Sequence, residues 1–375
     1  MSASLYVAIS YHGFGHIAQT GPIVNALGTR IPDLRVTLRC AAPLHVLQDH
    51  FRGSFEHIAE PVDDAMAMAN SLDVLAPASY AAYLETHRRW RALVRFEARR
   101  LCKLRPSLVL ANIPYVPLAA AAEAGIPALA LCSLHWGEVF YHYCRDKPEA
   151  DAIHREIHAA YHCANLFLNP EPSMPLPGLP TCRAVGPIAR IGRDRKGEIG
   201  ARLGIDPGDK LVLLFLGGIP TPVRYTQWRI PRGVVLLMSG THIDGGGAVY
   251  PIEAAGVSYI DLLASADALI TKPGYGSFVE AACNGIPVLY TPRRDWPEEP
   301  YTIRWLARHA RCRELERADL EQGRIADALG ALWAQPERPA VSPTGIEEAA
   351  TIIASYLDSP STGRLAHRQQ GGVRP

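Results

Sequence analysis

The sequence predicts an α/β protein with two Rossmann-like domains that face each other across a cleft. Short apolar runs alternate with segments of helical spacing in both halves of the chain, as is typical of parallel strands covered by helices. The chain has 375 residues, which is long for one hydrophobic core and sufficient for two. A passage rich in proline and glycine separates the two halves and is typical of a linker.

That passage sets the predicted domain boundaries. We expect the first domain over residues 1–168 and the second over residues 209–343. Between them, residues 169–208 are predicted to be a linker in which the density of proline leaves few regular elements. A helix is predicted over residues 344–357, and the polar tail 358–375 is predicted to be disordered.

The first half opens with an apolar strand over residues 5–9, a glycine-rich turn and a helix over residues 17–28. The working groups of parallel sheets collect in the turns at the carboxyl ends of the strands, so this turn is a candidate site. It consists of His12, Gly13, Phe14, Gly15 and His16. The other elements predicted here are strands over 34–39, 108–110 and 128–131 and a helix over 116–124.

Four strands are predicted in the second half, over residues 211–216, 234–238, 268–270 and 288–290. They are continuous apolar runs, as expected for strands of a parallel sheet that is covered on both faces. The connection between the first two strands is short for a full crossover helix. The second domain is therefore predicted to be shortened.

The most informative stretch runs from the third of these strands through a turn, Lys272 to Ser277, into a helix over residues 278–283. Glu280 lies in the first turn of this predicted helix. A helix start after such a turn presents unpaired N–H groups and a positive dipole end, which favour phosphate. A carboxylate there can accept two hydrogen bonds from a ribose diol. The combination suits a nucleotide diphosphate.

These residues resemble the donor-binding half of the GT-B glycosyltransferases, a group that includes UDP-glycosyltransferases and the lipid II-forming N-acetylglucosaminyltransferase. The KxGYG turn, the glutamate that follows it and the RRDWPEEP stretch after residue 292 are also similar to the glycosyltransferase-like portion of L-arabinokinase. The resemblance implies the GT-B fold. It further implies that the C-terminal helix packs back on the first domain.

The resemblance also implies roles for individual residues on the donor side. Glu280 would bind the ribose hydroxyls, and acidic residues after the next strand would bind the donor sugar, although Asp295 fits a solvated loop equally well. Glycines after the first strand of the second domain would let the diphosphate approach the backbone. The donor-binding residues predicted in this way are Gly217, Gly218, Lys272, Gly274, Tyr275, Gly276, Ser277, Glu280, Asp295, Glu298 and Glu299.

On the acceptor side, the resemblance makes His16 the general base that removes a proton from the acceptor hydroxyl. Imidazole suits this task because its pKa lies near neutrality, although a lone histidine after a strand is more often a turn residue. Many members of the group orient this histidine with an aspartate, where this chain has Asn112. An amide can hold an imidazole but cannot stabilise the imidazolium. Either another carboxylate such as Glu138 serves, or the acceptor needs little assistance, or the protein is not catalytic.

The predicted function is therefore an inverting, metal-independent glycosyl transfer from a nucleotide diphosphate sugar, with UDP as the default nucleotide and dTDP or GDP left open. Amide groups at the helix start would stabilise the leaving diphosphate, a task that other enzymes give to a metal. Two alternatives stay open. One is a degenerate protein that binds a nucleotide sugar without turnover, and the other is a nonhydrolysing UDP-sugar 2-epimerase.

Composition narrows the range of partners. The net charge of +1 gives no general attraction to nucleic acid. The eight cysteines are scattered without a CxxC pair, which predicts reduced thiols and no metal site. No apolar run reaches the roughly 18 residues of a transmembrane helix, and the N-terminus lacks the basic start of a signal peptide. We therefore expect a cytoplasmic protein with no cofactor besides its nucleotide-sugar substrate.

Residues 80–105 combine seven arginines with apolar residues at helical spacing. The simpler interpretation is a surface helix with one solvated basic face. The alternative is that Arg88 and Arg95 recognise an anionic acceptor or rest against acidic lipid. Peripheral membrane contact is therefore a possible partner interaction for the first domain.

Overall fold

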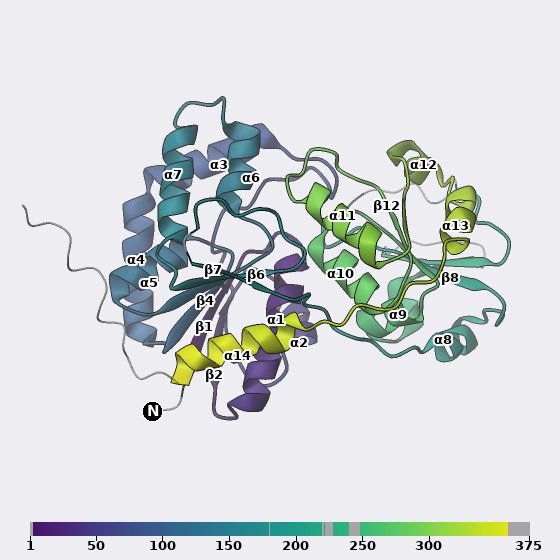
Figure 1. Cartoon of the computed structure of the whole chain (residues 1–375), viewed down its shortest axis with the longest axis horizontal. Helices are drawn as coiled ribbons and strands as arrows, with labels where there is room; N and C mark the ends of the chain where they lie inside the picture. The colour runs from purple at the N-terminus through teal and green to yellow at the C-terminus, as the bar shows by residue number, and fades with distance from the viewer. Residues whose placement is uncertain (1–2, 180, 220, 222–227, 240–247, 359–375) are drawn as a thin grey trace, which may run out of the picture.

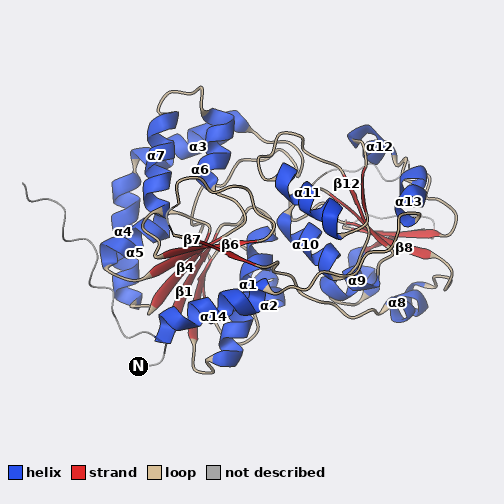
Figure 2. Ribbon diagram, viewed as in Figure 1, coloured by secondary structure: helices blue, strands red, loops and turns tan. Residues whose placement is uncertain are grey.

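A computed structural model of the chain describes residues 3–179, 181–219, 221, 228–239 and 248–358. It contains two parallel β-sheets, each covered by helices on both faces (Figure 2). The sheets form the cores of two lobes that lie side by side (Figure 1). The predicted fold class, two Rossmann-like α/β domains, is confirmed.

The first sheet has seven strands in the order β3-β2-β1-β4-β5-β6-β7, and all neighbouring strands are parallel. The central strand β1 lies between β2 and β4, with Leu5 opposite Val36 on one side and Ile9 opposite Asn112 on the other. The strands are β1 (Ser4–Ile9), β2 (Arg35–Arg39), β3 (Glu56–Ile58), β4 (Leu108–Asn112), β5 (Ala128–Leu131), β6 (Leu166–Pro170) and β7 (Cys182–Val185).

Side chains of β1 alternate between two apolar layers. Leu5, Val7 and Ile9 pack toward α1, whereas Tyr6 and Ala8 pack in the layer that contains α4 and α5, as the period of two in a strand requires. The helices of this lobe are α1 (Gly15–Arg30), α2 (Leu44–His50), α3 (Ala76–Arg88), α4 (Trp90–Leu104), α5 (Val116–Ala124), α6 (Trp136–Cys144) and α7 (Ala150–Tyr161).

The second sheet has six parallel strands in the order β10-β9-β8-β11-β12-β13. Its strands are β8 (Lys210–Leu214), β9 (Val234–Met238), β10 (Val249–Pro251), β11 (Ala268–Thr271), β12 (Val288–Tyr290) and β13 (Cys312–Glu314). Its helices are α8 (Lys196–Leu203), the 3₁₀-helix η2 (Ile252–Ala255), α9 (Tyr259–Ser265), α10 (Tyr275–Cys283), α11 (Glu299–His309), α12 (Arg317–Gln322) and α13 (Ala326–Trp333). The short crossover expected between β8 and β9 lies partly outside the described residues.

Residues 169–208, predicted to be a linker with few regular elements, contain β7 and α8. Strand β7 joins the first sheet at its edge, with Phe167 of β6 opposite Cys182. Three of its four residues are exposed, so it lacks the apolar run that marks a strand in sequence. The density of proline therefore did not exclude regular structure from this segment.

The arginine-rich segment 80–105, expected as one helix, is divided between α3 and α4 at Arg89. Helix α4 buries Val94, Ala98 and Leu101, while Arg88 and Arg95 are exposed. Their exposure fits the solvated face and leaves binding of an anionic acceptor or lipid as a prediction. In the part of the chain that the structure describes, no helix is both long and apolar enough to cross a bilayer.

The last helix, α14 (Gly345–Asp358), lies against α1 of the first lobe (Figure 1). Arg30 of α1 donates to Thr351 Oγ1 at 2.8 Å, and the N–H of Gly186 donates to Glu348 at 2.9 Å. A Cβ on Gly345 would lie 1.9 Å from the Gly186 carbonyl oxygen, so this crossing requires glycine. The chain thus returns to the first lobe after completing the second. The predicted disordered tail beyond Asp358 lies outside the described residues.

Strand order reverses at one place in each sheet, between β1 and β4 in the first and between β8 and β11 in the second. In open α/β sheets, ligands bind outside the carboxyl ends of the strands at such switch points. The turns that follow β1 and β11 each lead into a helix, α1 and α10, and these two helices contact each other. The fold therefore brings the two switch points to one cleft.

Candidate active site

A cavity of about 610 Å³ lies where these turns meet, and both lobes line it. This volume falls in the range of small-molecule sites. Most of the residues predicted from the sequence line it: His12, Gly13, Phe14, Gly15, His16, Gly217, Gly218, Lys272, Gly274, Tyr275, Gly276, Ser277, Glu280 and Glu298. The other three predicted residues, Asn112, Asp295 and Glu299, are not among the described residues that line it.

His16 is the second residue of α1 and is almost fully buried. Its Nδ1 lies 3.0 Å from Asn112 Oδ1. The other end of that amide, Nδ2, donates to Thr20 Oγ1 at 2.9 Å and to Gln19 Oε1 at 3.1 Å. These two acceptors fix the orientation of the amide, so Oδ1 accepts a hydrogen bond from the His16 Nδ1–H group. His16 Nε2 is thereby left with a lone pair.

Burial lowers the pKa of His16 to about 4, and the hydrogen bond to Asn112 acts in the opposite direction. The imidazole is therefore neutral at neutral pH. Nearby His12 is also held neutral, since burial and the charges around it lower its pKa to about 3. Both imidazoles contact the Trp136 ring, at centroid distances of 5.8 Å and 5.6 Å.

A chain of hydrogen bonds joins the histidine side of the cavity to Glu298 in the second lobe. Gln19 Nε2 donates to Ser133 Oγ at 3.0 Å, and Ser133 Oγ donates to Glu298 Oε1 at 2.7 Å. Trp296 Nε1 lies 3.4 Å from Glu298 Oε2. Because Gln19 also contacts Asn112, the position of His16 is coupled to that of a carboxylate on the facing lobe.

The turn after β11 shapes the opposite wall. Gly274 caps α10, which has no acidic residue in its first turn, and the first turn of α1 has none either. A Cβ on Gly276 would lie 3.8 Å from Gly15 Cα, so the starts of the two helices meet at the cavity. Their unpaired N–H groups and positive dipole ends make this junction attractive to an anion.

Lys272 lies beside this junction with its Nζ 3.4 Å from the Pro273 carbonyl oxygen. Burial lowers the pKa of Lys272 to about 7, and Arg293 acts in the same direction. Glu299 and Glu298 oppose this shift. The two carboxylates therefore neutralise the ammonium poorly, and a bound phosphate group would stabilise its charged form.

Glu280 is the sixth residue of α10 and lies in the second turn rather than the first, because the helix begins at Tyr275 and not at Phe278. The Glu280 carboxylate is buried and accepts a hydrogen bond of 2.9 Å from Arg190 Nε. Burial raises the pKa of Glu280, and Arg190 opposes the shift. The sequence prediction missed Arg190, which lies in the predicted linker 90 residues from its partner.

Two aromatic residues that the sequence prediction also missed line the cavity near Glu280. The rings of Phe215 and Tyr259 lie 4.7 Å apart. The Tyr259 hydroxyl is buried and has no hydrogen-bond partner among the described residues. An unpartnered buried hydroxyl costs free energy, so a ligand that accepts or donates a hydrogen bond there would be stabilised. Neither residue belongs to a motif that the sequence reveals.

The acidic residues after β12 have different environments. Glu299 accepts hydrogen bonds from the Arg293 backbone N–H at 2.9 Å and from Arg293 Nε at 2.5 Å. The Arg293 guanidinium lies 4.3 Å from the centroid of the Trp296 ring, which stacks on His12. Asp295 is exposed and contacts His142 Nε2 at 2.7 Å. Of the three predicted sugar-binding carboxylates, Glu298 alone lines the cavity among the described residues.

The structure shows why glycines are needed in the pair after β8, which the sequence does not reveal. Gly217 has a φ of +92°, and a Cβ on Gly218 would lie 2.9 Å from the Phe14 ring. The Phe14 ring is in turn stacked with Phe215 at 6.4 Å. These glycines therefore permit a close contact between the two lobes, in addition to the approach of a ligand that the sequence predicted.

Glu138 was considered above as a substitute partner for His16, but its carboxylate contacts two other histidines. Its Oε1 lies 2.7 Å from His158 Nε2 and 3.0 Å from His154 Nε2. Asn112 is thus the side chain that holds His16. The sequence predicted no cluster of metal ligands around Glu138, although the His154 to His158 spacing of four residues is visible in it.

Two facing Rossmann-like domains with a cavity between their switch points define a protein of the GT-B fold. No family model matches the chain. In sequence it is 27% identical over 325 residues to L-arabinokinase of Arabidopsis thaliana, a match that covers 84% of this chain and 30% of that protein. The chain therefore spans less than a third of this relative.

Solved structures place the chain in the same fold class. CalG4, the calicheamicin glycosyltransferase, superposes with a TM-score of 0.62 at 17% identity, over 98% of this chain and 100% of that one. A putative UDP-N-acetylglucosamine 2-epimerase from Listeria monocytogenes superposes with a TM-score of 0.55 at 12% identity, over 96% and 99% of the two chains. The predicted resemblance to GT-B proteins is confirmed.

Proposed function

We propose that this protein transfers a sugar from a nucleotide diphosphate sugar to an acceptor hydroxyl, with inversion of the anomeric centre and without a metal at the reacting diphosphate. One observation carries the proposal. A single cavity joins a buried neutral imidazole, His16, to the start of α10 with Lys272 and Glu280 beside it. A base and an anion site on facing lobes are what direct displacement of a diphosphate requires.

The donor would occupy the second lobe. Its diphosphate would lie at the starts of α10 and α1, where the amide groups and Lys272 supply positive charge. Glu280, with Arg190 beside it, would accept hydrogen bonds from the ribose hydroxyls, and Phe215 and Tyr259 would pack against the base. Glu298 would contact the donor sugar. UDP is the proposed nucleotide, with dTDP and GDP as the alternatives.

In the proposed step, His16 Nε2 removes the proton from the acceptor hydroxyl as its oxygen bonds to the anomeric carbon. The bond from that carbon to the diphosphate oxygen breaks on the opposite face, and its electron pair leaves with the diphosphate. One displacement inverts the centre. Asn112 Oδ1 holds the Nδ1 proton and so keeps Nε2 available as the base.

Two other functions are distinguished by their products. The similarity in fold to the epimerase admits isomerisation of a nucleotide sugar, and the amide at Asn112 admits a protein that binds without turnover. Incubation with each nucleotide sugar, with and without a panel of hydroxyl acceptors, separates the three by chromatography. A transferase releases nucleotide diphosphate only with an acceptor. An epimerase yields a new nucleotide sugar, and a binding protein yields neither.

Donor binding tests the role of Glu280 separately. Glu280→Gln keeps the shape of the side chain and removes its charge, so affinity for the nucleotide diphosphate should fall by about 10- to 150-fold, the value of a hydrogen bond to a charged group. Titration calorimetry with UDP, dTDP and GDP measures this change.

Glu198→Gln is the matched control for that titration, because Glu198 forms a comparable ion pair with Arg195 on the exposed surface of α8. We expect this variant to bind as the wild type does. Equal affinities of Glu280→Gln and Glu198→Gln for every nucleotide would remove Glu280 from the proposed ribose site.

A further inference from the structure

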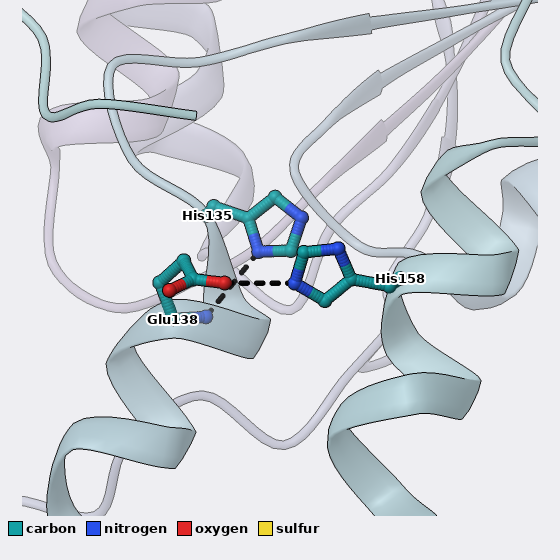
Figure 3. A group of neighbouring side chains, drawn as sticks. All are labelled: His135, Glu138 and His158. Atoms are coloured by element: carbon teal, nitrogen blue, oxygen red, sulfur yellow. Dashed lines mark hydrogen bonds and ion pairs between the residues drawn. The ribbon is translucent and has the colours of Figure 1, made fainter. Parts of the chain in front are cut away.

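A cluster of metal-ligating side chains lies in the first lobe at the contact between α6 and α7. Glu138 comes from the first turn of α6, and His135 caps the start of that helix. His154 and His158 are one helical turn apart on α7 and therefore share a face. Figure 3 shows His135, Glu138 and His158 pointing toward one another from the two helices. Their ligand atoms all lie within 4.8 Å of one another.

Three atoms of this cluster form a small triangle. Glu138 Oε1 lies 2.7 Å from His158 Nε2 and 3.0 Å from His154 Nε2, and the two Nε2 atoms are 3.1 Å apart. In a tetrahedral zinc site with bonds of about 2.0–2.1 Å, neighbouring ligand atoms are separated by about 3.3 Å. The triangle is slightly tighter than one face of such a site. A small outward movement of the side chains would admit an ion.

Hydrogen bonding alone satisfies this triangle poorly. If both Nε2 atoms carry a proton and donate to the carboxylate, the two N–H groups face each other at close range. If one Nε2 lacks its proton, that nitrogen can no longer donate to the carboxylate. A cation bound by three lone pairs removes the conflict.

His135 borders this triangle. Its ring is fully buried beside His158, with the ring centroids 4.5 Å apart. Its Nδ1 accepts a hydrogen bond from the Glu138 backbone N–H at 3.3 Å. Its Nε2 is buried and without a hydrogen-bond partner in the described part of the chain. Because Nδ1 accepts this hydrogen bond, the neutral ring carries its proton on Nε2. His135 therefore packs beside the cluster as an unsatisfied N–H group and is not counted among the ligands.

We propose that Glu138, His154 and His158 bind a divalent transition-metal ion, with the buried His135 ring packed beside them. Two imidazoles and one carboxylate are a ligand set that suits Zn²⁺ and disfavours Mg²⁺ and Ca²⁺, which prefer oxygen ligands alone. The three side chains are 24%, 23% and 19% exposed, so an ion can reach them from solvent. The proposal differs from the sequence-based expectation of no metal site.

The site is separate from the proposed sugar transfer, since neither its three ligands nor His135 is among the residues that line the cavity. It is nevertheless connected to the cavity through the chain. His135 precedes Trp136, whose ring contacts both His16 and His12. A metal that ties α6 to α7 would therefore hold Trp136 in place and stabilise the first lobe.

Titration calorimetry on the full chain, after removal of metal with a chelator, tests the proposal. We expect one equivalent of Zn²⁺ to bind and the melting temperature to rise, with no response to Mg²⁺. Glu138→Gln, His154→Ala and His158→Ala should each weaken Zn²⁺ binding by at least about 10-fold, since even outer residues of metal sites carry effects of that size. His162→Ala, an exposed histidine just beyond α7, should bind as the wild type does.

Cobalt substitution keeps the test informative if a variant fails to fold. Co²⁺ bound to the wild-type chain should give the intense visible absorption of a four-coordinate site, and Zn²⁺ should displace it. The proposal is overturned if the wild type binds no stoichiometric Zn²⁺, or if folded ligand variants bind it as tightly as the His162→Ala control. Nucleotide binding by the metal-free chain should persist, so this test and that of the proposed function fail separately.

Discussion

At the scale of single residues, burial shifts the pKa values of ionisable groups that line the cavity. His16 has a pKa of about 4 and Lys272 a pKa of about 7, against ordinary values of about 6.5 and 10.4. Both shifts favour the neutral form. His16 therefore stays unprotonated at neutral pH, and its low pKa makes it a weaker base than an ordinary imidazole. For Lys272 the shift means that charge at the anion site is lost as the pH rises.

These shifts predict the pH dependence of kcat/KM for the donor. The neutral imidazole of His16 is present above pH 4, so the acid limb should fall near pH 4 rather than near 6.5. The ammonium of Lys272 is present below pH 7, so activity should decline as the pH rises through 7. Because kcat/KM reports groups of the free enzyme, initial rates at low donor concentration measure both limbs.

Lys272→Met supplies the control for that profile. It should lower donor affinity and remove the alkaline limb while leaving the acid limb unchanged. An alkaline limb that persists in Lys272→Met would assign the decline to another group.

Asn112→Asp tests how the Asn112 amide affects the pKa of the His16 imidazole. A carboxylate beside His16 should raise the pKa of the imidazole and move the acid limb to higher pH. The same change removes the Nδ2 donor to Thr20 and Gln19, so the free energy of unfolding should fall by about 1–3 kcal/mol. NMR titration of the histidine and urea unfolding measure the two effects.

Asn165→Asp is the matched control for this variant. The Asn165 side chain accepts a hydrogen bond from the Ala128 N–H, and aspartate can accept the same bond. The acid limb of the kcat/KM profile of Asn165→Asp should lie at the same pH as in the wild type. An acid limb that does not move in Asn112→Asp would contradict the assignment of His16 as the base.

At the scale of elements, interior strands were predictable with the exception of β6, and edge strands were not. Strands β1, β4, β8 and β11 lie inside their sheets, and each is a buried apolar run with one polar residue at an end, so their sequences reveal them. Strands β3, β7 and β13 lie at the edges, and most of their residues are partly or fully exposed. Their formation depends on the neighbouring strand more than on their own residues.

The candidate site divides in a similar way. Turns after buried strands carried recognisable glycines, so His16, Lys272 and Glu280 could be found from the sequence. Arg190 and Ser133 could not, because each acts through a partner far away in the chain. Such pairs exist only once the two lobes meet, and a single sequence contains no signal for them.

The contact between Gly218 and Phe14 gives a prediction at this scale. Gly218→Ala should displace the Phe14 ring, which a Cβ would approach to 2.9 Å, and should lower the free energy of unfolding by about 1–3 kcal/mol, the usual cost of overpacking. Phe14→Ala in the same chain should recover part of this loss. Urea unfolding of the two single variants and the double variant measures the coupling.

Gly28→Ala provides the control for that cycle. Gly28 lies within α1, and a methyl group added there would meet no other atom within 4 Å, so alanine should stabilise the helix by about 0.5–1 kcal/mol. Additive effects of Gly218→Ala and Phe14→Ala would show that the two residues do not meet across the lobes.

At the scale of the whole molecule, the two lobes form one site because each contributes half of it. The first lobe holds His16 through Asn112, and the second holds Lys272 just before α10 and Glu280 in its second turn. Glu298 and Ser133 join the halves across the cleft, and α14 returns the end of the chain to the first lobe. Sugar transfer would use this arrangement, since donor and acceptor must approach from opposite sides of the anomeric carbon.

The most direct test of the account is a crystal structure of the chain grown with UDP. We expect the diphosphate at the start of α10 beside Lys272 and the ribose hydroxyls within hydrogen-bond distance of Glu280. A cavity that is closed by the protein's own side chains, or that stays empty at millimolar UDP, dTDP and GDP alike, would contradict the claim that this cleft binds a nucleotide sugar.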